Sequence, residues 1–289
     1  MQKILLIGSQ GQVGQELKKT LPQIGEVSSV TRTELDLNDS GAIVEVIETI
    51  KPDFIVNAAA YTAVDKAESE PEIARKINAQ APAVMAKASK DIGATLLHIS
   101  TDYVFNGQKN TPYLENDSTD PLGIYGITKR DGEQSIQEVG GRHIILRTAW
   151  VYGAYGKGNF VKTMLRLGRE KELVKIVYDQ IGSPTWSYDI AMRITEILKN
   201  IEKVPTGIYH FTDSGSISWY DFAMNIFEEA RKLGFTFKMQ EVIPISTHEY
   251  PTPAKRPAYS VLSNQKLIDC LGTYPPYWRD SLKKMLVQL

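Results

Sequence analysis

A tyrosine and a lysine stand four residues apart, at Tyr125 and Lys129, in the stretch GIYGITKRDGEQ of residues 123–134. On a helix, residues at this spacing share one face, with their Cβ atoms about 6 Å apart. A lysine so close to a phenol can tune its proton affinity. The pair can therefore be a solvated surface pair or a proton donor for an oxygen that gains negative charge, as in the reduction of a ketone, and the rest of the sequence decides between them.

A third reactive group, Thr101, follows the apolar run ATLLHIS of residues 94–100, which predicts a buried strand. We expect the Thr101 hydroxyl at the carboxyl end of that strand, where it can donate to a substrate carbonyl. Asp120-Pro121 predicts a helix start ahead of the tyrosine, because Asp is a good N-cap and Pro a good first helical residue. The predicted catalytic residues are Tyr125, Lys129 and Thr101.

A glycine-rich turn separates the apolar run KILLIG (3–8) from a helix-compatible segment. Its glycines, Gly8, Gly11 and Gly14, are spaced G-x-x-G-x-x-G. Glycines at such a turn let backbone N–H groups approach a diphosphate at the start of a helix. The pattern predicts a dinucleotide site.

The end of the next strand, Val30-Thr31-Arg32, bears on which dinucleotide binds. In NAD sites of this kind an acidic residue usually holds the ribose hydroxyls. Arg32 instead suits the 2′-phosphate of NADPH, and Asp36 can accept from the adenine amino group. We expect NADPH to be preferred, with NADH as the alternative.

Short apolar runs alternate with helical patterns in the first half of the chain, and the longest helical pattern covers residues 68–90. Apolar runs followed by helices indicate a parallel sheet covered on both faces by right-handed crossovers. The predicted fold class is α/β, a doubly wound, Rossmann-like parallel sheet. The apolar runs lie at residues 3–8, 26–30, 53–59, 94–100 and 142–148.

The two halves differ in regularity, which predicts two domains. Residues 1–150 are expected to bind the dinucleotide, and residues 151–289 to form mainly a smaller substrate-binding lobe. That lobe is expected to be partly discontinuous, with some segments returning to the first domain. Its strand-like stretches are ELVKIVYD and GIYHFTD, and its helical stretches are YDIAMRITEILKNI and SWYDFAMNIFEEARKLG.

Composition excludes several classes of protein. The 289 residues carry 33 basic and 34 acidic side chains, so no positive surplus favours a nucleic acid. No apolar stretch reaches the ~20 residues of a membrane span, and no signal peptide is apparent. Cys270 is the only cysteine, which favours a reducing cytoplasm. No metal site is predicted, because the histidines, His98, His143, His210 and His248, are scattered, and those in strands are expected to be core residues.

Taken together, these residues resemble the extended short-chain dehydrogenase/reductase family. Within it, the likeness is to reductases of dTDP-linked sugars and runs nearly from end to end. The segments that carry it are ILLIGSQGQVGQEL, DFIVNAAAYTAVDKAESEP, HISTDYVFNG, YGITKRDGE, ILRTAWVYG, GNFVKTMLRL, DQIGSPT, YPTPAKRPAYSVL and a terminal W-x-x-x-L-K-K-M-L.

The resemblance implies reduction of the C4 ketone of dTDP-4-dehydro-L-rhamnose to dTDP-L-rhamnose. It implies that Tyr125 donates the proton, with Lys129 on the nicotinamide ribose and Thr101 on the substrate carbonyl. Further cofactor contacts are implied for Gly11, Gln12, Val13, Asp36, Leu37, Ala60, Tyr61 and Thr62. Substrate contacts are implied for Thr101, Asp102, Tyr125, Trp150, Asn159 and Arg256, the last of which could instead form a structural ion pair.

Two other functions stay open at this point. A sugar-nucleotide dehydratase or epimerase would share the fold, although Tyr103 stands where related dehydratases carry an acid. A regulatory subunit like that of methionine adenosyltransferase resembles the same reductases without needing their activity. Some relatives are described as dimers bridged by magnesium through glutamates. Glu16 matches one of these glutamates, but the terminal KKMLVQL has none, so no metal is predicted and a homodimer remains an alternative to a monomer.

Overall fold

The computed structural model describes residues 1–289 and is built around one parallel sheet of six strands. Its order is β10-β5-β4-β3-β1-β2, and every neighbouring pair is parallel. The chain leaves β1 towards one edge and returns at β3 towards the other, which creates a crevice at their carboxyl ends. The strands are β1 (Gln2–Ile7), β2 (Gly25–Val30), β3 (Phe54–Asn57), β4 (Thr95–Thr101), β5 (His143–Thr148) and β10 (Gly207–His210).

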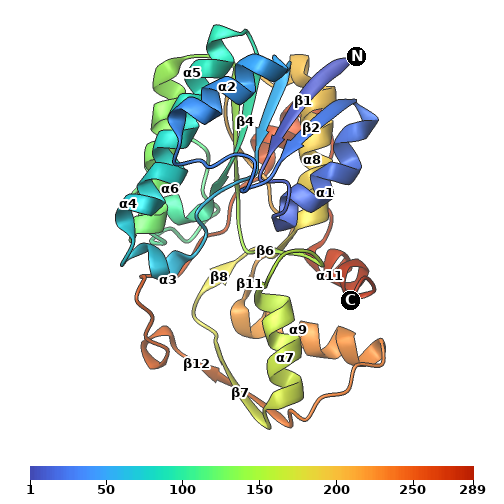
Figure 1. The fold of residues 1–289 in the computed structure, drawn as a ribbon. Coiled ribbons are helices and arrows are strands. Elements are labelled where there is room, and N and C mark those ends of the chain that lie inside the picture. Colours follow the sequence, from blue (N-terminus) through green and yellow to red (C-terminus); the bar gives the residue numbers. More distant parts are fainter.

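Helices cover both faces of this sheet (Figure 1). On one face α1 (Gln12–Thr20) packs against α8 (Ser187–Lys199). On the other face α5 (Ala81–Asp91) lies between α2 (Ser40–Ile50) and α6 (Ile124–Val139). The predicted doubly wound α/β fold is therefore confirmed.

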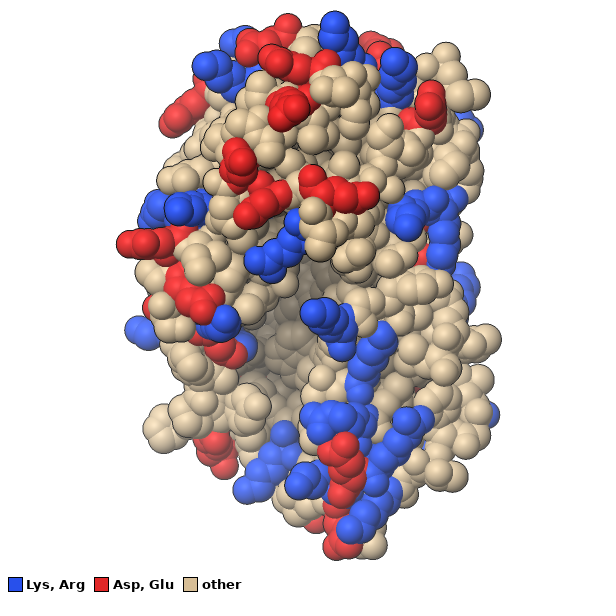
Figure 2. All heavy atoms as spheres, viewed as in Figure 1, with Lys and Arg blue, Asp and Glu red and all other residues tan.

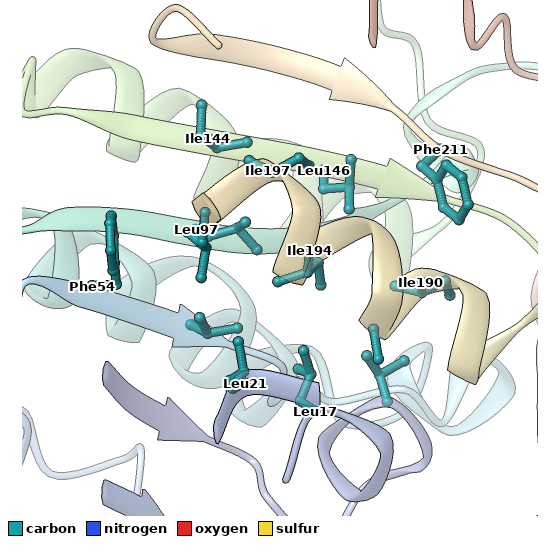
Figure 3. Packing of buried hydrophobic residues seen from close by; sticks show 14 of the residues in the cluster. Leu17, Leu21, Phe54, Leu97, Ile144, Leu146, Ile190, Ile194, Ile197 and Phe211 are labelled. Atoms are coloured by element: carbon teal, nitrogen blue, oxygen red, sulfur yellow. The ribbon is translucent and has the colours of Figure 1, made fainter. Parts of the chain in front are cut away.

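The packing of α8 shows why its sequence reads as an amphipathic helix. Ile190, Ile194 and Ile197 recur at helical spacing and are fully buried against the sheet (Figure 3). Leu97 and Leu146 from the central strands meet them. Burying each such side chain contributes roughly 1.5–3 kcal/mol. Residues from beyond position 150 thus complete the core of the first half.

A second hydrophobic core of 17 buried residues is rich in aromatic side chains, and the elements that form it lie below the sheet in Figure 1. We call the elements that form it the small lobe. Strands β7 and β12 pair in parallel within it. The elements are α7 (Phe160–Glu170), β7 (Leu173–Val177), α9 (Trp219–Lys232), β12 (Glu241–Ile245) and α11 (Trp278–Leu286).

The helical pattern over residues 68–90 is confirmed, but the helix is not regular throughout. The structure has α4 (Pro71–Arg75), a π-helical turn η2 (Lys76–Gln80) and then α5. Pro82 has no N–H to donate to the carbonyl of Asn78, so the regular ladder cannot continue there. That carbonyl faces Gly132 of α6, where an added Cβ would lie 2.1 Å from it. The π turn therefore lets α6 approach closely.

The remaining elements are short and connect these layers. No helix of the structure combines the length and the apolar character that crossing a membrane requires. The short elements are α3 (Val64–Ala67), α10 (Gln265–Leu271), β6 (Val151–Tyr152), β8 (Ile181–Gly182), β9 (Thr185–Trp186), β11 (Ile217–Ser218), η1 (Leu21–Gln23), η3 (Asp102–Val104), η4 (Ile201–Lys203) and η5 (Thr247–Glu249).

Candidate active site

A cleft of about 810 Å³ lies at the carboxyl ends of the central strands and extends towards the small lobe. Figure 2 shows a hollow in this face, with Lys and Arg side chains gathered beside and below it. Most of the residues predicted from the sequence line the cleft. They are Gly8, Gly11, Gln12, Val13, Arg32, Asp36, Leu37, Ala60, Thr62, Thr101, Asp102, Tyr125, Lys129, Trp150 and Asn159. Gly14, Tyr61 and Arg256 are not among its lining residues.

The glycine turn forms the floor of the cleft at the start of α1. Gly8 has a φ of +85°, and a Cβ there would lie 2.6 Å from the backbone nitrogen of Ala59. Gly14 has a packing role, since its Cβ would lie 2.1 Å from the Gly8 carbonyl oxygen. No side chain caps α1 at Gly11, so the first N–H groups of the helix are left for a ligand. This cradle fits an anionic diphosphate.

The helix that carries Tyr125 begins at Ile124, and its N-cap is Gly123. The expected Asp120 cap is wrong, because the Asp120 side chain instead accepts a hydrogen bond from Asn106. Glu68, from a distant loop, accepts the Ile124 N–H at 2.8 Å and replaces a local cap. Tyr125 nevertheless lies in the first turn of this helix, as predicted.

Tyr125, Thr101 and Asp102 meet in the cleft. Burial raises the pKa of Tyr125 to about 12; the neighbouring Thr101 hydroxyl lowers it and the charge of Asp102 raises it. Burial also raises the pKa of Asp102 to about 6. One oxygen of Asp102 accepts from Thr101 at 3.0 Å, and the other has no hydrogen-bond partner. At neutral pH the phenol therefore holds a proton that it can donate.

Lys129 lies one turn further along α6, on the same face as Tyr125, and only 1% of it is exposed. Its Nζ donates to the Ile99 carbonyl at 2.7 Å and lies 3.0 Å from Nε2 of His98. Burial lowers the pKa of Lys129 to about 8, while the charge of Glu133 opposes that shift. The amine is thus directed at β4, and the pKa of Tyr125 is raised by burial rather than lowered.

A buried ion pair connects the elements that carry Thr101, Tyr125 and Lys129. Arg147 of β5 and Glu133 of α6 form two hydrogen bonds, of 2.6 and 2.9 Å, with both side chains 2% exposed. Ser100, next to Thr101, donates to the same carboxylate at 2.5 Å. The network joins β4, β5 and α6 where the reactive groups lie. Ser100, Glu133 and Arg147 form no local sequence pattern, so this network could not be predicted from the sequence.

The adenine end of the predicted cofactor site is open to solvent. Arg32 and Asp36 are both exposed. Asp36 accepts hydrogen bonds from the backbone and side chain of Asn38 at 3.0 and 2.8 Å, which lower its pKa. Arg32 forms no ion pair. Its guanidinium is therefore free for an anionic ligand.

The middle of the cleft is bordered by the loop after β3. Asn78 fixes this loop, because its side chain accepts from Tyr61 N at 2.8 Å and donates to Tyr61 O at 3.1 Å. The Tyr61 hydroxyl donates to Glu70, so its side chain is directed away from the cleft. Ala60 and Thr62, on either side, line the cleft as expected.

Trp150 stands in the cleft with an unusual backbone conformation, a φ of +47°. Its indole stacks on Trp219 of α9, with ring centroids 3.4 Å apart and planes 4° apart. Gly182 makes room, because a Cβ there would lie 2.4 Å from the indole. Positive φ is costly for such a residue and is held here by packing. The small lobe therefore sets the position of this predicted substrate contact.

Asn159 links the glycine turn with the small lobe. Its Nδ2 donates to Oε1 of Gln12 at 2.7 Å, and its Oδ1 accepts from Lys162 N at the start of α7. Arg256, by contrast, forms the structural ion pair that the sequence left open as the alternative to a substrate contact. It forms two hydrogen bonds with Asp65, of 3.0 and 2.9 Å. A substrate contact of Arg256 therefore stays a prediction.

Glu16, considered as a metal ligand at a dimer interface, lies on α1 with only 1% of its side chain exposed. One oxygen pairs with Lys19 at 3.1 Å, and the other has no hydrogen-bond partner. It is thus held inside its own subunit rather than presented at the surface.

Comparison with known proteins decides among the families that share this geometry. A family model described as the RmlD substrate binding domain matches residues 1–289. The chain belongs to this family. The RmlD family relationship confirms the resemblance inferred from the sequence, and it extends over both the sheet and the small lobe.

Individual relatives agree with the RmlD family assignment. The chain is 44% identical to a dTDP-4-dehydrorhamnose reductase of Escherichia coli (strain K12) over 293 residues, which cover 99% of this chain and 97% of that protein. A reductase of the same name from Burkholderia thailandensis is also 44% identical, covering 96% and 95%. The crystal structure of a Bacillus anthracis dTDP-4-dehydrorhamnose reductase in complex with NADP superimposes with a TM-score of 0.92 at 38% identity, covering 100% and 99%.

Proposed function

We propose that this protein reduces the C4 ketone of dTDP-4-dehydro-L-rhamnose to dTDP-L-rhamnose, with NADPH or NADH as the reductant. The observation that carries the proposal is the meeting of Thr101, Tyr125 and Lys129 in a cleft that also contains the glycine turn. Full-length relatives named for this reaction support the choice of substrate. The reaction is the last step of dTDP-L-rhamnose synthesis.

The cleft fits a nicotinamide dinucleotide. The uncapped start of α1 suits its diphosphate, and the unpaired Arg32 suits a 2′-phosphate. Lys129 would hold the nicotinamide ribose, and Ala60 and Thr62 would border the middle of the cofactor. When bound, the reduced nicotinamide supplies the hydride. NADP in the Bacillus anthracis relative supports this assignment.

The chain's own residues supply the proton and the orientation. In our proposal Thr101 donates to the substrate carbonyl, and Tyr125 gives its proton to the oxygen as negative charge develops there. Asp102 and Trp150 would border the deoxysugar, with Asn159 between the two binding regions. Burial of the phenol matters, because it keeps the proton on Tyr125 until that charge appears.

The direct test follows NADPH and NADH oxidation by the purified protein. The substrate dTDP-4-dehydro-L-rhamnose is generated in situ by the enzymes that precede this step. Loss of reduced cofactor with formation of dTDP-L-rhamnose is expected. A different sugar nucleotide formed without net consumption of the cofactor would indicate an epimerase. Cofactor binding without turnover would favour the regulatory function.

Arg32 gives a specific prediction about cofactor choice. Replacing Arg32 with alanine should raise the KM for NADPH about tenfold, because a charge-assisted contact to the 2′-phosphate is lost, and leave the KM for NADH unchanged. Initial rates with both cofactors measure this. Arg32→Lys is the matched control and should retain part of the preference. Equal effects on both cofactors would exclude a 2′-phosphate contact.

We further propose the arrangement of the whole molecule. Residues 1–150 with α8 and β10 bind the dinucleotide, and the small lobe binds the sugar nucleotide. The single cysteine, Cys270, which is free and half-buried, supports a cytoplasmic location. A homodimer stays a prediction, which light scattering of the purified protein tests.

A further inference from the structure

Two buried residues next to Lys129 belong neither to the predicted site nor to the mechanism above. Asn57 is the last residue of β3, and His98 lies beside it in β4; both are 0% exposed. The Asn57 amide lies 3.0 Å from Nδ1 of His98, and Nε2 of the same ring lies 3.0 Å from Nζ of Lys129. The side chains of Asn57, His98 and Lys129 thus form a connected chain of polar contacts from the sheet interior to the cleft.

The orientation of the Asn57 amide follows from its second partner. Its Oδ1 accepts the backbone N–H of Ala59 at 3.1 Å, and a backbone N–H can only donate. The NH₂ end of the amide is therefore the end that faces His98. Nδ1 of His98 must accept, and a neutral imidazole that accepts at Nδ1 carries its proton on Nε2.

This tautomer limits the protonation of Lys129. An ammonium has three donors and no acceptor, so it would face the Nε2–H of His98 donor to donor. A neutral amine satisfies every contact: it accepts from Nε2–H, donates to the Ile99 carbonyl at 2.7 Å and keeps one N–H for the cleft. Buried polar groups without partners are costly, so the neutral amine is favoured.

We propose that His98, with its tautomer set by Asn57, is a positioning residue that favours the neutral amine of Lys129 over its ammonium form in the cofactor-free protein. The role in reduction rests on the proposed function, but the protonation state of Lys129 does not. A neutral amine keeps its position on β4 and leaves one N–H for a ligand in the cleft. The pair thus prepares Lys129 to bind the cofactor.

Other charged groups around α6 do not supply this effect. Glu133 would favour the ammonium, but its carboxylate is paired with Arg147. From α4, Arg75 pairs with Asp131 on the outer side of α6. Lys90 of α5 bonds the Val139 carbonyl at the far end of the helix. The other titratable groups that line the cleft are Arg32, Asp36, Asp102, Tyr103, Tyr125 and Lys157.

Nuclear magnetic resonance of the ligand-free protein tests the proposal directly. With lysine labelled at Cε with ¹³C, the signal of Lys129, assigned through Lys129→Met, should titrate near pH 8, the value to which burial lowers its pKa. Long-range ¹⁵N–¹H spectra of the unmutated protein should show the His98 proton on Nε2. A proton on Nδ1, or titration of Lys129 near 10.4, would overturn the proposal.

Two matched variants separate His98 from burial alone. His98→Asn leaves no donor for Lys129, so the Lys129 titration should move up by about one pH unit. His98→Gln can place its amide N–H near the position of Nε2, with its oxygen accepting from Asn57, and should titrate as the unmutated protein does. Equal titration in all three proteins would overturn the role of His98. Should His98→Asn fail to fold, the tautomer measured in the unmutated protein still decides.

Discussion

Replacing Tyr125 with phenylalanine should lower the turnover of ketone reduction by roughly 10²-fold or more, with cofactor binding little changed. General acid catalysis contributes about 10²–10⁴-fold, and the phenol is the group placed to give a proton. A 10²-fold loss corresponds to about 2.7 kcal/mol of transition-state stabilisation. Phenylalanine keeps the edge-to-face packing on Tyr103, where the ring centroids are 5.5 Å apart. Steady-state kinetics with NADPH titrations measure both effects.

The structure offers a matched control for this experiment in Tyr103. It is the other phenol that lines the cleft, and burial raises its pKa as well. It lies in η3 outside the helix that carries the lysine, so Tyr103→Phe should change turnover only a few-fold. A Tyr125→Phe enzyme with a near-normal rate would remove the tyrosine from the role of proton donor. Equal losses in both variants would point to packing instead.

The parts of this site that could be predicted are those with a local pattern. The glycine turn at Gly8, Gly11 and Gly14 follows a buried strand, and chain connectivity alone brings it to the crevice. Tyr125 and Lys129 are four residues apart on one helix, so their common face follows from helix geometry. Thr101 ends a strand, and the ends of parallel strands lie at one edge of the sheet.

The parts that could not be predicted depend on residues brought together across the fold. Glu68 replaces the expected Asp120 cap of α6 from more than 50 positions earlier in the chain. Asp65 pairs with Arg256, which lies 191 positions later in the chain. No pattern in either segment indicates that these two residues are partners. His98 was expected to be an ordinary core residue, and it is buried, but its partner Lys129 gives it a place beside the site.

The buried Arg147–Glu133 pair is another contact between separate elements, and its loss should have the largest effect on stability. Replacing Arg147 with methionine leaves the Glu133 carboxylate buried, with Ser100 as its only remaining side-chain donor. Breaking a buried pair by removing one partner typically costs about 3–5 kcal/mol, because an uncompensated charge remains in the interior. Urea unfolding should show a lower midpoint with an unchanged slope. Turnover of the folded fraction should also fall, since the pair positions the strand end that carries Thr101.

The loss of stability in Arg147→Met arises from the unpaired Glu133 charge rather than from a large net contribution of the ion pair to stability. A double variant separates these two effects. Glu133→Leu combined with Arg147→Met removes both charges, and a buried pair replaced by apolar groups of similar size is often nearly neutral in stability. The double variant should therefore be more stable than Arg147→Met alone, which a double-mutant cycle quantifies. A loss below about 1 kcal/mol in Arg147→Met would mean that water reaches Glu133. Recovered stability without recovered turnover in the double variant would show that the charges are retained for the position of Ser100 and Thr101, and not for the stability of the fold.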